Sequence, residues 1–165
     1  MNPFKCYGIL WNDNYSFAKD FLNDINSNFK LENLYFMNIN DITYDFVKQI
    51  YPEMLPDEYA KYKANMLATH DCVNVVVFCF SVPNPEFKYN PEEFQDYCVQ
   101  VKQLKTALRR KYVPQIMNYE HDILAHFADN ENESNLIRAA LNKNKDRIVK
   151  ILGAKNKTKD SSNER

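Results

Sequence analysis

Glycine is scarce in this chain: among 165 residues it occurs only at positions 8 and 153. The Gly-x-Gly-x-x-Gly fingerprint of dinucleotide sites and the P-loop both need several glycines, because the backbone must approach the phosphates closely. Neither motif is present. A doubly wound parallel sheet more usually carries Gly-rich turns after its strands, so the same scarcity disfavours that fold.

Patterns typical of metal sites and disulfide frameworks are also missing. The four cysteines form no Cys-x-x-Cys pair, and only three histidines are present. We therefore expect four reduced thiols in the core of a cytosolic protein. The neighbours His70 and Asp71, and again His121 and Asp122, invite comparison with His-Asp metal hydrolases. Such sites need further ligands from several helices, so no metal site held by the protein alone is expected.

Strong net charge and long apolar runs are absent as well. The formal net charge is −1, so no overall field steers the chain toward nucleic acid or a membrane surface. The longest apolar run, residues 73–82, is too short to span a bilayer. The first five residues lack a signal-peptide pattern, which predicts a cytoplasmic location. Length and composition predict one domain over residues 1–152 and a disordered tail over 153–165.

The hydrophobic pattern predicts strands and helices in alternation. The expected strands are residues 6–11, 31–39, 73–80 and one between 115 and 125. The expected helices are one with Phe17, Phe21 and Ile25 on its apolar face, then 41–50, 57–69, 90–111 and 131 to about 152. The strand at 73–80 is apolar nearly throughout, which predicts a central position. This order predicts a ferredoxin-like α+β fold, with a four-stranded antiparallel sheet and helices mainly on one face.

The segment from His121 to Asn130 is the most informative stretch. It combines a short apolar run, His126 and the expected start of the last helix. A helix start offers free N–H donors and a partial positive charge, and imidazole titrates near neutral pH, so together they can form a phosphate site. A simpler interpretation remains open, in which Asp129 and Asn130 only cap the helix and the histidine bonds a nearby carbonyl.

Two motifs connect the chain with a known family. Residues 8–13 (Gly-Ile-Leu-Trp-Asn-Asp) fall where nucleoside diphosphate kinases have a first strand ending in Lys-Pro-Asp. Residues 122–130 (Asp-Ile-Leu-Ala-His-Phe-Ala-Asp-Asn) fall where that family has Asn-x-x-x-His-Gly-Ser-Asp-Ser before its C-terminal helix. In these motifs and in element order, the chain resembles a divergent relative of nucleoside diphosphate kinase over about residues 5–145.

The resemblance implies a set of site residues. His126 takes the position of the phosphorylated histidine, Asp129 that of the motif's aspartate, and Lys105 that of a phosphate-binding arginine. The basic helix end from Lys105 to Lys111 is expected to approach His126 and form the most positive cleft, although a solvated helix end is the simpler interpretation. The predicted nucleotide- or phosphate-binding residues are Lys105, Arg109, Arg110, Asp122, Asp129, Asn130 and Trp11, the last as a stacking surface for a base.

The chain departs from the family at positions that serve phosphoryl transfer. Trp11 replaces the first-strand lysine, and Phe127 and Ala128 replace Gly and Ser after the histidine. The glutamate that orients the family's histidine falls at Ile137, and an arginine of the nearly missing nucleotide loop falls at Val113. Each change removes positioning or charge stabilisation that the reaction needs.

The sequence therefore predicts a domain that binds a nucleotide or another phosphorylated small molecule, with Mg²⁺ accompanying a triphosphate. Phosphoryl transfer through His126 is expected to be weak or lost, so enzymatic activity stays open. One alternative is an inert protein-interaction scaffold of the same fold, which associates as a homo-oligomer through its sheet edge. A second is a phosphotransferase or nucleotidyltransferase acting on another phosphate compound.

Overall fold

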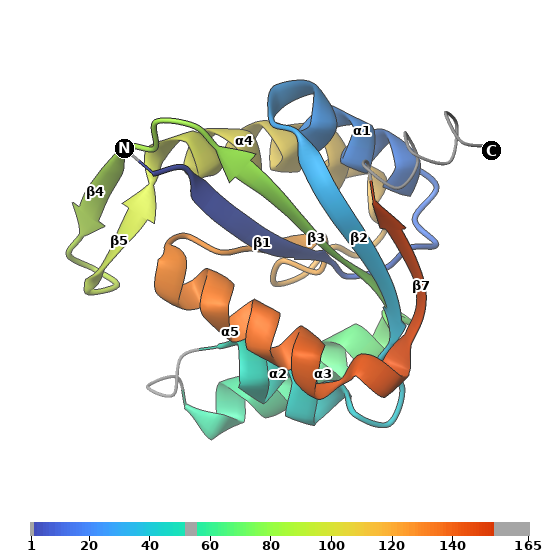
Figure 1. Cartoon of the computed structure of the whole chain (residues 1–165). Helices are drawn as coiled ribbons and strands as arrows, with labels where there is room; N and C mark the ends of the chain where they lie inside the picture. The colour runs from blue at the N-terminus through green and yellow to red at the C-terminus, as the bar shows by residue number, and fades with distance from the viewer. Residues whose placement is uncertain (1, 52–55, 154–165) are drawn as a thin grey trace, which may run out of the picture.

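The computed structural model describes residues 2–51 and 56–153, in which a five-stranded sheet is the central element (Figure 1). Strands β1 to β7 span Phe4–Leu10, Leu31–Asn38, Asn74–Val82, Phe87–Asn90, Gln95–Cys98, Ala125–Phe127 and Ile148–Gly153. Helices α1 to α5 span Ala18–Asn28, Thr43–Ile50, Asp57–Thr69, Val99–Tyr112 and Glu131–Lys143. The predicted tail, apart from Gly153 at the end of β7, lies outside the described residues.

The sheet has the order β6-β1-β3-β2-β7, and every neighbouring pair is antiparallel. The predicted α+β class and the antiparallel sheet are therefore confirmed. Strand β3 lies in the middle, and Val75 and Val77 are fully buried, as its β-branched, apolar sequence predicts. The strand count is corrected from four to five, because β7 pairs with β2 and extends the sheet.

Helices cover both faces of this sheet, which corrects the prediction that they lie mainly on one face (Figure 1). On one face, Phe21 of α1 packs against Phe78 of β3 and Phe127 of β6, and α1 contacts α4. On the other face, α5 contacts both β1 and α2, and α2 contacts α3. Alternation along each strand places successive side chains on opposite faces, so His126 faces the layer opposite to Phe127.

Two segments that were predicted to be helical form strands. Residues 90–98 make the turn and second strand of a hairpin, in which the Asn90 side chain accepts a hydrogen bond from the Glu92 N–H. This Asx-type turn uses the same residue types as a helix N-terminus. Helix α5 ends at Lys143, and the apolar residues 148–153 pair with β2 instead of continuing the helix.

Other predicted elements agree closely with the structure. Helix α3 has the predicted bounds, α2 begins two residues after the predicted start, and Phe17, Phe21 and Ile25 are buried at α1. All four cysteines are buried free thiols. In the part of the chain that the structure describes, no helix has the length and hydropathy needed to cross a membrane.

Candidate functional site

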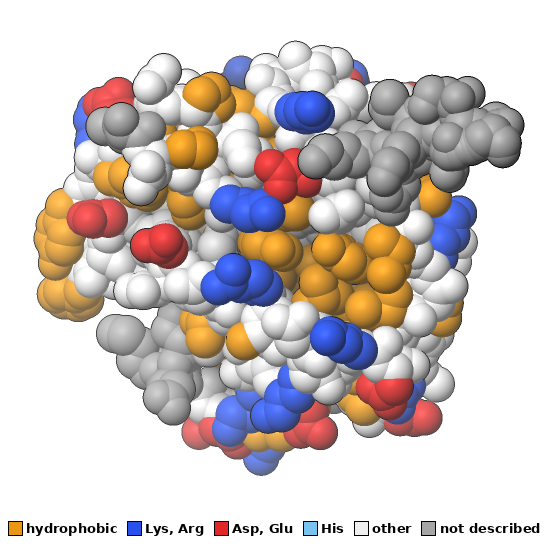
Figure 2. Space-filling view, in the orientation of Figure 1, with side chains coloured by type: hydrophobic (Ala, Val, Ile, Leu, Met, Phe, Trp, Pro, Cys, Tyr) orange, Lys and Arg blue, Asp and Glu red, His pale blue; other side chains and the backbone are white. Residues whose placement is uncertain are grey.

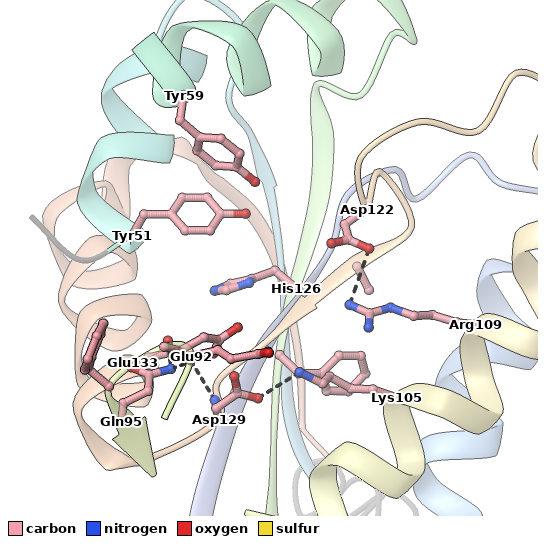
Figure 3. A pocket seen from close by; sticks show the side chains of 14 residues that line it. Tyr51, Tyr59, Glu92, Gln95, Lys105, Arg109, Asp122, His126, Asp129 and Glu133 are labelled. Atoms are coloured by element: carbon pink, nitrogen blue, oxygen red, sulfur yellow. Dashed lines mark hydrogen bonds and ion pairs between the residues drawn. The ribbon is translucent and has the colours of Figure 1, made fainter. Parts of the chain in front are cut away.

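A pocket of about 510 Å³ opens beside His126. Figure 3 shows the imidazole between two groups of side chains: Tyr51 and Tyr59, from the α2–α3 side, and residues of the β4–β5 hairpin and α5. Helix α4 contributes two cations, and the segments on either side of β6 contribute carboxylates. The pocket thus lies beside the edge strand β6, where α3, α4, α5 and the β4–β5 hairpin meet.

His126 lies within β6 and pairs with Ile9 of β1, so the last strand of the predicted four begins at the end of its predicted range, 115–125, and includes the histidine. Its Nε2 atom is buried and has no hydrogen-bond partner among the described residues. Burial, assisted by the nearby charges of Lys105 and Lys63, lowers the pKa of His126 to about 3. The imidazole is therefore neutral at physiological pH, the state in which a ring nitrogen can accept a bond.

The two α4 cations in the pocket are each paired with a carboxylate. Lys105 Nζ lies 2.7 Å from Asp129 Oδ1, and both side chains are largely buried. Arg109 lies 3.4 Å from Asp122 Oδ1, with both side chains more exposed. The residues Lys105 and Arg109 are four apart on a helix and so share one face. The predicted approach of this helix to His126 is confirmed for these two residues.

The start of α5 forms the floor of the pocket near Asp129. The Asn130 side chain accepts a hydrogen bond from the Glu133 N–H at 3.0 Å, which confirms its role as helix cap. Glu133 Oε1 accepts from the Asp129 N–H at 2.8 Å, and its Oε2 accepts from Gln95 Nε2 at 2.9 Å. Burial raises the pKa of this carboxyl. One of the first donors of the helix, the Glu133 N–H, is therefore occupied within the protein.

A buried lysine of α3 holds the turn that carries Asp122 of the pocket. The sequence did not indicate this lysine. Lys63 Nζ donates to the backbone carbonyls of His121 and Asp122 at 2.5 and 3.1 Å. Both acceptors have positive φ angles, 35° and 56°, so the ammonium holds a strained turn in place. The Lys63 ammonium also lies 5.5 Å from the centre of the Trp11 ring. Burial lowers the pKa of Lys63 to about 8.

Asn130 caps α5 without lining the pocket, and two further predicted site residues do not reach it. Trp11 is fully buried and packs edge-on against Phe46 of α2, so it offers no surface to a base. Arg110 is exposed and lines a separate surface hollow with Lys88 and Lys102. The prediction was wrong for both residues, because Trp11 continues the buried end of β1 and Arg110 is rotated about 100° from Arg109 around α4.

The prediction that this is the most positive cleft is also wrong, since the hollow at Arg110 is lined by three cations and no carboxylate. Among the described lining residues, Lys105 and Arg109 are outnumbered by carboxylates, which are Glu92, Glu93, Asp122, Asp129 and Glu133. No group of three or more His, Cys, Asp or Glu side chains able to hold a metal occurs within residues 2–51 and 56–153. A resident metal does not fit these residues, whereas Mg²⁺ bound mainly by ligand phosphates needs only one or two carboxylates.

Residues that the sequence did not indicate complete the site, among them Tyr51, Tyr59, Gln95 and Glu133. Burial raises the pKa of Tyr51 well above its usual value, so its hydroxyl stays protonated. The only sequence signal for any of them is Glu133, three residues after the Asn130 cap, as in a capping box. Comparison with protein-family models, with curated proteins and with solved structures gave no match in any of the three.

Proposed function

We propose that this domain binds a phosphorylated small molecule, with a nucleotide as the ligand and Mg²⁺ as its counter-ion, and that phosphoryl transfer through His126 is weak or absent. The observation that carries this proposal is the convergence of a neutral His126 with Lys105 and Arg109 on one pocket. Cations at the phosphates and an uncharged acceptor beside them are what phosphate binding and transfer to histidine require.

The topology supports the same proposal. The strand order β6-β1-β3-β2, to which β7 is added, agrees with the ferredoxin-like plan that the resemblance to nucleoside diphosphate kinases implies. On this plan the short strand that carries His126 lies at the sheet edge beside the first strand, in line with the resemblance in residues 122–130. Fold likeness alone does not carry chemistry, so the proposal depends on the pocket residues.

The ion pairs in the pocket explain how an anion would bind despite the excess of carboxylates. Asp129 and Asp122 hold the Lys105 and Arg109 side chains in place before a ligand arrives. A phosphate takes the position of a carboxylate oxygen on Arg109, and Mg²⁺ offsets the added negative charge. We therefore expect the magnesium complex of a nucleotide to bind more tightly than the free nucleotide.

We expect weak phosphoryl transfer because of the burial and protonation of the two ring nitrogens of His126. Because Nε2 is buried, we take Nδ1 as the nitrogen that meets a ligand in the pocket. Attack by Nδ1 needs its lone pair, which places the proton on Nε2, where the described residues provide no acceptor. An unsatisfied buried donor costs about 1–3 kcal/mol, and no bond at Nε2 fixes the reactive tautomer. The buried Ile137, at the family's glutamate position, cannot accept this bond.

Binding is tested by thermal unfolding and calorimetry with ATP, with and without Mg²⁺. Replacement Arg109→Met should weaken MgATP binding roughly 10- to 100-fold, because a charge-assisted hydrogen bond contributes about 1.5–3 kcal/mol. The neighbouring Arg110→Met variant is the matched control and should bind like the wild type, since Arg110 lines another surface. Equal loss in both variants, or no stabilisation of the wild type by any nucleotide, would contradict the proposal.

Transfer is tested with ATP that carries labelled γ-phosphate. The wild type should form at most a slow, acid-labile adduct, in which a bond forms from His126 nitrogen to phosphorus while ADP leaves. His126→Asn should form none, whereas His121→Asn, altered outside the pocket, should behave like the wild type. Rapid exchange of γ-phosphate between nucleotides would show that other residues replace the missing lysine and glutamate.

One surface feature favours the alternative of an interaction scaffold. Figure 2 shows an apolar patch on the face that carries α5 and β7 in Figure 1. A hollow there is lined mainly by apolar and aromatic side chains, which are Tyr7, Tyr35, Leu141, Ile148 and Ile151. Strand β7 lies at the edge of the sheet, where a second copy can pair with it. Failure of every nucleotide to stabilise the protein would favour this function.

A further inference from the structure

The β4–β5 hairpin presents one aromatic side chain at the pocket that no motif predicted as functional. Phe94 is 75% exposed and belongs to the residues that line the pocket. On the same hairpin, Phe87 packs edge-on against Phe4, and Tyr89 is exposed but lies outside the pocket lining. The ring is therefore open to solvent at the pocket, where a ligand can pack against its face.

The backbone at Phe94 is held in an unusual conformation. Its φ angle is 55°, in the left-handed region that bulky residues rarely adopt. The hairpin is tied to the pocket on the side of α5: Gln95 bonds Glu133, the Asn130 side chain donates to the Asp96 carbonyl at 2.8 Å, and the Cys98 N–H donates to the Asp129 carbonyl at 2.7 Å. These bonds fix the strained turn that carries Phe94 before any ligand binds.

The rest of the pocket determines what kind of ligand fits beside this ring. The cations Lys105 and Arg109 come from α4, whereas Phe94 comes from the hairpin, so polar and apolar recognition use separate elements. Figure 3 shows Lys105 and Arg109 on one side of His126 and the hairpin residue Gln95 on the other. A ligand that uses both sides has an anionic group for the cations and a flat apolar part for the ring. Nucleotides combine these two parts.

We infer that Phe94 recognises the ligand by stacking on its planar ring, the base of a nucleotide, while Lys105 and Arg109 bind the phosphates. This inference rests on the proposed function and adds the residue that recognises the base. Stacking uses the face that every base offers, so Phe94 distinguishes ligands with a ring from those without one and discriminates little among bases. It takes the part that the sequence suggested for Trp11, which is buried in the core.

The test compares two probes, MgATP and magnesium tripolyphosphate, by calorimetry on the full chain. Phe94→Ala should weaken MgATP binding about tenfold or more, and should change tripolyphosphate binding less than twofold. Phe94→Trp should retain MgATP binding, because it restores an aromatic face. Tyr89→Ala is the matched control, since it removes an exposed aromatic ring of the same hairpin that lies outside the pocket lining.

Each outcome separates the inference from the proposed function. If the wild type binds MgATP and Phe94→Ala binds it equally well, the inference is overturned and the proposed function stands. If Phe94→Ala weakens both probes equally, the ring acts by holding the hairpin and stacking is overturned. If the wild type binds neither probe, the proposed function fails, and the inference fails with it.

Discussion

Replacement of His126 by Gln is expected to remove a large part of the acid sensitivity of the fold. Burial lowers the pKa of His126 to about 3, against an ordinary value of 6.5. Below pH 6.5 the unfolded chain binds a proton at this residue and the folded chain does not. The contribution of the neutral histidine is thus complete above pH 6.5 and is lost as the pH falls toward 3, at up to about 1.4 kcal/mol per pH unit.

Urea unfolding between pH 7 and 5 measures this effect, in a range where most carboxyl groups stay ionised. Wild type should lose about 2 kcal/mol over the lower part of the range, and His126→Gln should lose much less. His121→Gln serves as control, because that side chain is exposed and should leave the slope unchanged. Equal slopes in the wild type and His126→Gln would show that the imidazole is solvated in solution.

The same burial links stability to the proposed chemistry. A histidine that stays neutral well below pH 7 is always in the form that can meet a phosphate, but its buried Nε2 limits the tautomer that can react. Because His126 does not change its charge between pH 6 and 8, it should contribute little to any pH dependence of nucleotide binding in that range. A transfer rate should be low throughout that range, since the limit comes from a missing acceptor and not from protonation.

Local patterns predicted those elements in which the signal and the packing agree. Helix α3 and strand β3 were predicted correctly. The helical spacing after Pro56 fits only a helix, and the unbroken apolar run fits only a buried strand. Residues 90–98 and 148–153 were predicted to be helical, and that prediction was wrong. The sequence Asn-Pro-Glu is typical of a turn as well as of a helix start. Residues 148–153 form a strand because they pair with the free edge of β2, which lies more than a hundred residues earlier in the chain.

The candidate site was predicted as far as its residues follow from periodicity or from the motif. His126, Lys105 and Asp129 are brought together as the resemblance implied; of the two predicted arginines, Arg109 lines the pocket and Arg110 does not. The remaining lining comes from α2, α3 and the β4–β5 hairpin, which the topology brings beside β6 across long sequence separations. Tyr51, Lys63 and Phe94 carry no local signal, so only the three-dimensional packing identifies them.

Gly8 is the position where a single added carbon should disturb both the fold and the site. A Cβ at Gly8 would lie 2.4 and 2.5 Å from ring atoms of Phe78 and 2.9 Å from the backbone oxygen of His126. Both neighbours are held, since Phe78 is fully buried and the backbone of His126 is part of β6. Gly8→Ala is therefore expected to destabilise the protein by about 2–3 kcal/mol, despite the lower chain entropy of alanine.

A double-mutant cycle with Phe78→Leu identifies the cause. Leucine lacks the ring atoms that the new Cβ meets, so the double variant should be at least about 1 kcal/mol more stable than the sum of the two single changes predicts. The contact with the His126 oxygen remains in the double variant, so β6 stays displaced and MgATP binding should recover less than stability does. Additive losses would place the strain elsewhere. Full recovery of binding together with stability would show that the backbone of β6 adjusts freely, and that the position of His126 does not depend on the close approach of β1.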